Sequence, residues 1–442
     1  MVRALWLWLL VPATGVAQTL EIRGACPGTV TLTASGLTPG GTYAVLSSPG
    51  TGTAAMAGGP CAGTTTGLAT PSVRRRGVVP ADGVVTASPS LGAAACGVAV
   101  QWLDGSTCAV TNAVPLTDGM RGVDLDDPAL RWLGRVDDTD PTARPLYWPG
   151  SGFVTDVEGD AVHIEVEDTT GNNHLVITAD GVVNRIVDLV PGHQWVEVDG
   201  LGAGLHTLRL TKRTEGADGD AIVRRILIES GAAIQASPSP AVRFEFYGDS
   251  ITAGYSVLCV CDDGSPQYKA HDLTYASLTA AAFDGEHTAV AISGVGIERS
   301  WWPANMFDYW DSVRDSDHAW DFAEWPADVV VINLGQNDYW LGVGSNLTDA
   351  YVDFGLAVRA VHPTAEVFFA LGSMDAVAPG SPVPGYLQDA VTELNTVHGD
   401  PAVHAVVFDY NGVGIHPVVP HQQDMADTLI DAITAARPDL VP

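Results

Sequence analysis

The stretch Phe244-Glu245-Phe246-Tyr247-Gly248-Asp249-Ser250-Ile251-Thr252 decides the fold of this chain. Its aromatic half predicts a buried β-strand, and Gly-Asp-Ser predicts a sharp turn from that strand into a helix. A serine at such a turn projects its hydroxyl, and its own backbone N–H points into the same space. In an α/β sheet, functional side chains lie at the carboxyl ends of strands. Ser250 is therefore a candidate nucleophile in a domain built on a parallel sheet.

Four further apolar runs follow this strand, and helical stretches separate them. The runs are 289–292, 329–334, 367–371 and 405–408, and the helical stretches lie near 273–283, 347–361, 386–398 and 422–436. Alternation of this kind predicts a five-stranded parallel sheet with helices on both faces. We assign this α/β domain to residues 241–442.

Two β-rich regions precede the α/β domain. Residues 18–118 hold short alternating strands between turn signals, which predict a small β-sandwich accessory domain. Residues 129–240 hold seven candidate strands with period-two patterning and no helical period, which predicts a second antiparallel β-sandwich. The segment 119–128 between them is rich in Asp and Gly and is interpreted as a linker. Its acidic residues hint at a calcium loop, but the loop glycine and the closing Glu of such a site are missing.

The first seventeen residues have the pattern of a secretory signal peptide. Arg3 supplies the positive start, residues 4–11 supply an apolar run, and Gly15-Val16-Ala17 supplies a small-residue cleavage site. The apolar run is too short for a membrane span, which needs about 20 residues. The mature protein is therefore expected outside the cytoplasm, secreted and without a membrane partner.

The six cysteines fit an exported protein. Four of them lie in the 18–118 region, and we predict the pairing Cys26–Cys61 with Cys96–Cys108. Cys259 and Cys261 have no partner outside their own loop unless they bridge to each other. The spacing of a four-ligand zinc site is absent.

The charge balance excludes nucleic-acid partners. The chain has 21 Lys and Arg against 52 Asp and Glu, a formal net charge of −31. Such a molecule repels nucleic acids and anionic lipid headgroups. The one dense basic run, Arg74-Arg75-Arg76, stands beside glycine and proline and is interpreted as a solvated loop.

Polar residues follow three of the predicted strands. Ser250 follows the first, Asn337 follows the third, and His416 stands just ahead of the last helix. Ester hydrolysis by a serine needs a nucleophile, a base and donors to the oxyanion, and these three side chains can supply them. Gly-x-Ser-x-Gly is absent, which argues against an ordinary α/β-hydrolase. No nucleotide fingerprint appears, and prolines at 417 and 420 interrupt a metal site of His416, His421 and Asp424, so we expect no cofactor and no metal.

These strand ends resemble the four sequence blocks of the SGNH (GDSL-like) hydrolases. The matching residues are Gly248-Asp249-Ser250-Ile251-Thr252, Gly294 with Gly296, Gly335-x-Asn337-Asp338 and His416-Pro417. The likeness extends to carbohydrate esterase family 2, in which a jelly-roll β-sandwich precedes the SGNH domain. The segments that match its pattern are 133–136, 148–152, 212–215, 292–296, 330–335 and 421–426. The resemblance covers residues 129–442.

The resemblance implies a role for each block. Ser250 would be the nucleophile and one oxyanion donor, and His416 would be the base. The side-chain amide of Asn337 would be a second donor, and the N–H of either Gly294 or Gly296 would complete the hole.

The sequence departs from the family pattern at two places near His416. Val413 stands where SGNH enzymes carry an Asp, so we predict that a main-chain carbonyl of 412–414 orients His416; Asp409 or Asp424 is the alternative. Gly414-Ile415 replaces the Asp-Trp that often precedes the His in family 2. The predicted substrate-binding residues are Asp249, Trp301, Tyr339 and Trp340. The missing aromatic would be replaced by Trp301, Trp302, Tyr339 or Trp340.

The function implied is that of an exported carbohydrate O-acetyl esterase. It would remove acetyl groups from an acetylated polysaccharide or oligosaccharide, such as xylan or glucomannan, through a serine acyl-enzyme. One alternative is a carbohydrate-binding protein on an SGNH scaffold whose hydrolase activity has decayed, which Val413 and Ile415 favour. Another is a general short-chain esterase or lipase.

Overall fold

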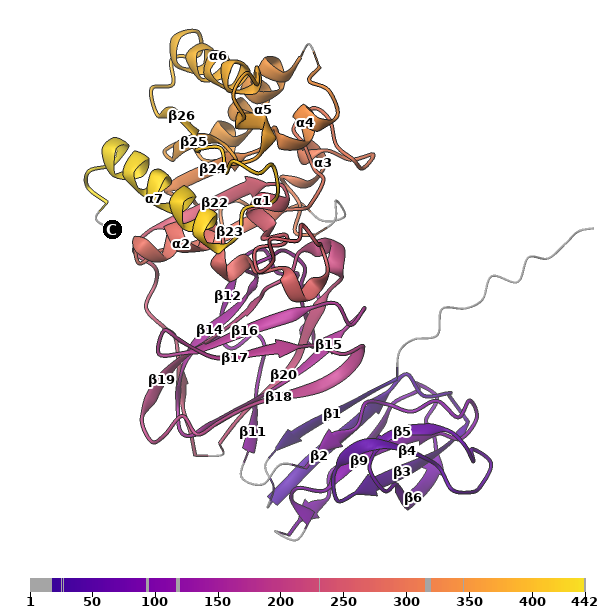
Figure 1. Ribbon diagram of the computed structural model, residues 1–442. Helices are drawn as coiled ribbons and strands as arrows, with labels where there is room; N and C mark the ends of the chain where they lie inside the picture. The colour runs from indigo at the N-terminus through magenta and orange to yellow at the C-terminus, as the bar shows by residue number, and fades with distance from the viewer. Residues whose placement is uncertain are drawn as a thin grey trace, which may run out of the picture. The chain divides into compact units, whose positions relative to one another are not determined.

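A computed structural model describes residues 18–24, 26, 28–92, 95–116, 120–229, 231–314, 319–344 and 346–440. The predicted signal peptide lies outside the described residues. The chain divides into two compact units, residues 1–122 with 227–230, and residues 123–226 with 231–442 (Figure 1).

The first unit is the predicted small β-sandwich. One antiparallel sheet contains β1 (Thr19–Gly24), β2 (Gly28–Ser35), β7 (Val85–Ala87) and β8 (Ser90–Leu91). The other has the order β10 (Val114–Pro115), β9 (Ala99–Asp104), β3 (Thr42–Ser48) and β6 (Ser72–Val78). The strands β4 (Thr51–Ala55) and β5 (Thr65–Leu68) form a hairpin. The Arg74–Arg76 run was predicted as a loop, but it lies on the exposed strand β6.

The predicted pairing of the first four cysteines is wrong. The bonds are Cys26–Cys96 and Cys61–Cys108. Cys61 packs in the same small core as Leu103 of β9, and the chain that leaves β9 leads directly to Cys108. Spatial neighbours in a sandwich are distant in sequence, so pairing by order along the chain fails. Cys259 and Cys261 bridge to each other.

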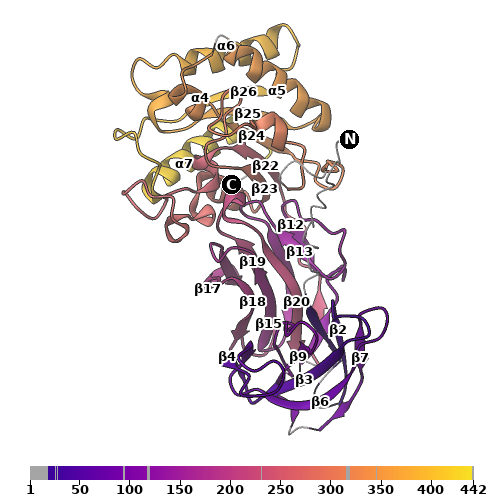
Figure 2. The ribbon, with the colours of Figure 1, turned by 90° about the vertical axis from the view of Figure 1, so that its right-hand side faces the viewer.

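The second unit begins with the jelly-roll β-sandwich, whose two sheets are antiparallel (Figure 2). One sheet contains β13 (Arg144–Leu146), β20 (Ala221–Glu229), β15 (Ala161–Asp168) and β18 (Gly192–Asp199). The other runs β12 (Arg131–Leu133), β14 (Gly152–Glu158), β19 (Leu205–Lys212), β16 (His174–Ala179) and β17 (Val182–Asp188), with β21 (Ile234–Gln235) beside β14. In the acidic segment before it, Asp126 pairs with Arg144 and Asp127 accepts from the N–H of Ala129.

The α/β domain of the second unit confirms the predicted five-stranded parallel sheet. The strand order is β23 (Glu286–Ala291), β22 (Arg243–Gly248), β24 (Val329–Asn333), β25 (Glu366–Leu371) and β26 (Val403–Val407). The first strand in sequence thus lies between the second and the third. Strand order reverses at this point, which is where open α/β sheets place their ligands.

Helices cover both faces of this sheet. On each face the helices and the strands pack against each other through an apolar core. On one face α5 (Leu347–Val361) and α6 (Val383–Thr396) pack over Val330, Ile332 and Phe369. On the other, α2 (Tyr275–Ala282) and α7 (Val419–Ala436) pack over Phe244, Phe246 and Phe368. Two short helices, α1 (Ser250–Ala253) and α4 (Gln336–Trp340), begin directly after β22 and β24.

Buried charges join the jelly-roll and α/β domains within the second unit. Arg135 leaves the jelly-roll and forms an ion pair with Glu245 of β22, and both side chains are fully buried. Arg213 pairs with Asp272, with Nε and Oδ1 2.6 Å apart. Asp220 pairs with Arg314 at 2.5 Å. The two domains therefore share one polar junction beneath the sheet.

Candidate active site

Ser250 is the first residue of α1, directly after β22. Asp249 caps this helix, because its Oδ1 accepts the N–H of Ile251 at 2.9 Å. The Ser250 hydroxyl lies 2.8 Å from Nε2 of His416, which the chain supplies just before α7. The two ends of the α/β domain thus bring a serine and an imidazole within hydrogen-bond distance, as the sequence predicts.

A carboxylate, and not a main-chain carbonyl, holds the far nitrogen of His416. Oδ1 of Asp262 lies 2.5 Å from Nδ1 of His416, and it also accepts the backbone N–H of His416 at 3.2 Å. Both the predicted carbonyl and the alternatives Asp409 and Asp424 are therefore wrong.

The carbonyl prediction fails because the segment before His416 folds onto Asn411. The side-chain oxygen of Asn411 accepts the N–H groups of Val413 and Gly414, each at 3.1 Å. Its amide donates to the carbonyl of Ile415 at 2.6 Å. This segment therefore bonds to Asn411, and the imidazole of His416 bonds to Asp262 on a separate loop.

The loop that carries Asp262 contains a disulfide and hydrogen bonds of its own. The Cys259–Cys261 disulfide comes directly before Asp262. The Ser256 hydroxyl donates to the carbonyl of Cys259 and accepts the N–H of Asp263, both at 3.0 Å. The hydrogen bond with His416 lowers the pKa of Asp262, although 41% of this side chain is exposed. Asp262 is therefore ionised at neutral pH, as a partner for an imidazolium must be.

Two aromatic rings flank the imidazole of His416. The ring of Tyr255 lies 4.3 Å from it and that of Trp340 lies 6.4 Å from it, centroid to centroid. The indole N–H of Trp340 donates to Asp375 at 3.1 Å, and 38% of Trp340 is exposed. Trp340 is thus placed where a substrate beside His416 would meet it.

The predicted oxyanion donors gather beside Ser250. Asn337 is buried in α4, and its amide donates to the carbonyl of Val295 at 2.9 Å and to Oδ2 of Asp249 at 3.3 Å. The N–H of Gly296 donates to the Ser300 hydroxyl at 2.9 Å. The single N–H of Gly296 is engaged in a bond of ordinary length, which favours Gly294 as the glycine of the hole. The Asn337 amide has two N–H groups, and its 3.3 Å bond to Asp249 is the longer of its two bonds.

Glycine is required at both positions by the path of the chain. Gly294 has a φ of +86°, a backbone conformation that residues with a Cβ rarely adopt. A Cβ on Gly296 would lie 2.0 Å from the carbonyl oxygen of Arg299. We use the name oxyanion loop for residues 292–302.

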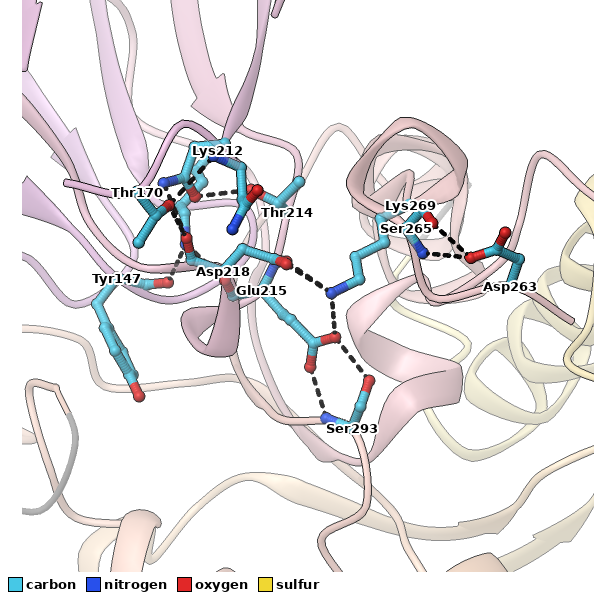
Figure 3. Close-up of polar contacts among 12 residues, drawn as sticks. Tyr147, Thr170, Lys212, Thr214, Glu215, Asp218, Asp263, Ser265, Lys269 and Ser293 are labelled. Carbon is cyan, nitrogen blue, oxygen red and sulfur yellow. Dashed lines mark hydrogen bonds and ion pairs between the residues drawn. The ribbon is translucent and has the colours of Figure 1, made fainter. Parts of the chain in front are cut away.

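The oxyanion loop is tied at both ends to other parts of the second unit. The carboxylate of Asp338, in α4, accepts three consecutive backbone N–H groups, those of Ile297, Glu298 and Arg299. At the other end Glu215, from the jelly-roll, holds Ser293 (Figure 3). Glu215 was part of the matched segment 212–215, but its position between β19 and β20 gave no sign of a partner in the oxyanion loop.

The four predicted substrate-binding residues have different surroundings. Trp301 is 57% exposed and Trp340 lies beside His416, so both can contact a ligand. Tyr339 packs against the apolar core of the α/β domain. Asp249 is 1% exposed and bonds to Ile251 and Asn337, so its contacts here are with the protein's own groups, and its role as a substrate contact stays a prediction.

Neither a metal-ligand cluster nor a membrane-spanning helix occurs among the described residues. No group of three or more His, Cys, Asp or Glu there could hold a metal ion. Across the same residues no helix has both the length and the apolar character of a membrane span.

Comparison with known proteins assigns both domains of the second unit. Residues 132–238 match the family model described as Carbohydrate esterase 2 N-terminal, and residues 246–433 match that of the GDSL-like Lipase/Acylhydrolase family. Both domains of the second unit therefore resemble those of carbohydrate esterase family 2. The chain is 29% identical over 327 residues to the Cellulase/esterase CelE of Acetivibrio thermocellus, a match covering 69% of this chain and 39% of that protein.

Two further relatives support the assignment. An Acetylxylan esterase / glucomannan deacetylase of Cellvibrio japonicus is 24% identical over 278 residues, which cover 60% of this chain and 77% of that one. The solved structure of a family two carbohydrate esterase from Clostridium thermocellum, in complex with cellohexaose, has a TM-score of 0.65 and 26% identity. It covers 69% of this chain and 98% of the other.

Proposed function

We propose that this chain is an exported carbohydrate esterase that removes O-acetyl groups through a serine acyl-enzyme. The observation that carries the proposal is the unbroken chain of contacts from Asp262 through His416 to Ser250. A nucleophile within reach of a base, with the base oriented by a third group, is the arrangement that acyl transfer needs.

The geometry assigns a step to each group. Asp262 accepts a hydrogen bond from the Nδ1–H of His416, which leaves Nε2 unprotonated and free to take the Ser250 proton as the hydroxyl attacks the acetyl carbonyl. The oxyanion that forms accepts hydrogen bonds from the N–H groups of Ser250 and Gly294 and from the Asn337 N–H that gives up its 3.3 Å bond to Asp249. His416 then protonates the departing sugar hydroxyl, and water repeats the sequence to release acetate.

Carbohydrate is the substrate class that the relatives and the site support. The Cellvibrio japonicus relative is named for acetylxylan and glucomannan, and the Clostridium thermocellum structure contains cellohexaose. In this chain Trp301 and Trp340 are 57% and 38% exposed, and they follow β23 and β24, the two strands on either side of the strand that leads to Ser250. Aromatic rings of this kind are suited to packing against the faces of sugars.

Export is supported by the disulfides and by the predicted signal peptide. Three disulfides occur among the described residues. Disulfides persist in oxidising compartments and are rare in the cytosol. The proposed site of action is therefore outside the cytoplasm, where plant-type polysaccharides are degraded.

Comparison of the wild type with Ser250→Ala on 4-nitrophenyl acetate tests the catalytic part of the proposal. Turnover should be abolished while the circular dichroism spectrum stays unchanged. A series of longer acyl chains should show a steep loss of activity beyond acetyl, and acetylated xylan and glucomannan should release acetate. Retention of turnover by Ser250→Ala would refute the acyl-enzyme, and preference for long acyl chains would indicate a lipase instead.

A further inference from the structure

All three main polar groups of Ser293, the residue before Gly294, are held by side chains. Its N–H donates to Oε2 of Glu215 at 2.6 Å, and its hydroxyl donates to Oε1 at 2.7 Å (Figure 3). Its carbonyl accepts the indole N–H of Trp302 at 2.7 Å. Glu215 thus holds the N–H and the hydroxyl of Ser293, and Trp302 holds its carbonyl.

The carbonyl of Ser293 and the N–H of Gly294 belong to one peptide unit. A peptide unit is planar and almost always trans, so its C=O and N–H point in opposite directions. By fixing the carbonyl, Trp302 fixes the direction of the Gly294 N–H. Gly294 has a φ of +86° and carries no Cβ, so the residue itself offers little resistance to rotation of this peptide.

Glu215 is itself held rigidly in the junction of the two domains. It is 1% exposed, and Nζ of Lys269 lies 2.9 Å from its Oε1. The same ammonium bonds both carboxylate oxygens of Asp218, at 2.8 and 2.7 Å (Figure 3). Burial disfavours the charged ammonium, but Glu215 and Asp218 outweigh that effect and raise the pKa of Lys269.

The jelly-roll backbone around Glu215 is held by hydrogen bonds from Lys212. Lys212 donates to the carbonyls of Glu215 and Tyr147, at 2.7 and 2.8 Å (Figure 3). Buried charges of this kind are weak contributors to stability, because desolvation offsets their attraction. What such a cluster provides is a fixed position for the carboxylate that Ser293 contacts.

We propose that Glu215 and Trp302 are positioning residues for the oxyanion donor Gly294. On this account the jelly-roll domain is a working part of the active site, because it supplies the carboxylate that anchors the oxyanion loop. The inference rests on the proposed acyl-enzyme function, and it adds two residues that act on the reaction through Ser293.

The test compares Glu215→Gln and Trp302→Phe with Asp220→Asn in the full chain. Glutamine keeps the shape of the side chain but weakens its hold on Ser293, and phenylalanine keeps an aromatic ring but removes the indole N–H. Asp220 is a matched control, because it lies on the same loop and pairs across the same junction with Arg314 without contacting Ser293. Glu215→Gln should lower kcat by about 10–100-fold and Trp302→Phe by about 3–10-fold, with KM little changed; loss of a whole oxyanion donor costs about 10²–10³. Asp220→Asn should keep kcat close to the wild-type value, because the change removes a charge from the junction without touching Ser293 or the oxyanion loop.

A thionoester of the same acid and alcohol separates positioning from a merely structural role. Sulfur is a larger and weaker hydrogen-bond acceptor than oxygen, so an intact oxyanion hole favours the oxygen ester. The ratio of kcat/KM for oxygen ester over thionoester should fall in Glu215→Gln and Trp302→Phe and stay at the wild-type value in Asp220→Asn. An unchanged ratio in both variants, or losses no larger than that of the control, would overturn the proposal.

Two measurements keep the result interpretable. If Glu215→Gln fails to fold, Trp302→Phe decides the question alone, because Trp302 is 51% exposed and its ring is retained. Ser250→Ala in the same assay tests the acyl-enzyme itself. Activity in Ser250→Ala would refute the proposed function, whereas full activity of the two positioning variants would refute only this inference.

Discussion

Asp262 is the residue on which the chemistry of His416 depends. Asp262→Asn keeps the shape of the side chain but offers an N–H to Nδ1, which favours the wrong tautomer of the imidazole. Because Asp262 is partly exposed, water can replace part of its stabilisation of the imidazolium. We therefore expect kcat to fall by about 10²–10³. The pre-steady-state burst of 4-nitrophenol should slow by the same factor.

Asp263→Asn is the control for this change. Asp263 is the next residue and is exposed, and its carboxylate bonds only to Ser265 among the contacts that the structure gives it. It should keep activity within about twofold. Equal losses in Asp262→Asn and Asp263→Asn would show that the loop, and not the carboxylate at His416, is responsible.

Asp249 should make the stability of the chain depend on pH. Burial raises the pKa of Asp249 from 3.8 to about 7. Between these values the folded state holds a proton that the unfolded state has lost, so folding stability falls as pH rises through this window. Asp249→Asn removes this titration, and the difference in unfolding free energy between variant and wild type should shift by about 4 kcal/mol in favour of the variant between pH 4 and pH 8. Urea denaturation followed by tryptophan fluorescence measures it, and parallel pH profiles would contradict the assignment.

Sequence motifs located Ser250, Asn337 and His416, because each follows a strand or precedes a helix with a strong apolar pattern. They did not locate Asp262, which lies 154 residues from His416 on a loop without periodic structure. Glu215 was hidden for the same reason. Both contacts are set by how separate elements meet in space, and no local pattern in the sequence records that.

At the scale of elements, the Cys259–Cys261 bridge lies directly before Asp262 in its loop, and we expect it to restrain that loop. Reduction should loosen this loop and lower kcat by about tenfold, a part of the loss expected for Asp262→Asn. The double variant Cys259→Ser/Cys261→Ser should show the same loss without reductant, and its activity should not respond further to reduction. This control excludes effects of the two disulfides in the first unit. Full activity of the double variant would show that the bridge is dispensable.

Strands and helices of the α/β domain were predictable because their apolar periods are long and regular. The structure has helices at 275–282, 347–361, 383–396 and 419–436, close to the expected ranges. The pairing of cysteines in the first unit was not predictable, because it depends on which strands become neighbours in a sandwich. The exposed arginines of β6 were missed because a strand of charged residues has no apolar alternation.

At the scale of the whole molecule, the two units are expected to contribute differently to catalysis. The fragment 120–442 begins at β11 (Met120–Val123) and retains the jelly-roll, Glu215 and the complete site. It should hydrolyse 4-nitrophenyl acetate with a kcat within about twofold of that of the full chain, since no residue proposed for chemistry is removed. The fragment 241–442 lacks Glu215 and Arg135, which leaves the buried Glu245 and Lys269 without these partners, and it should be insoluble or inactive. An inactive 120–442 fragment would show that the first unit is more than an accessory.

The bond between Glu215 and Ser293 also constrains the order in which the chain can become active. The two residues are 78 positions apart, and the strands of the jelly-roll are complete before the oxyanion loop has been added to the growing or emerging chain. Until Lys269 and Ser293 are present, the carboxylate of Glu215 has neither of these partners. A chain that ends before Ser293 contains Ser250 but lacks Gly294, Asn337 and His416. We therefore expect hydrolysis only after the α/β domain is complete and the junction has closed around Glu215.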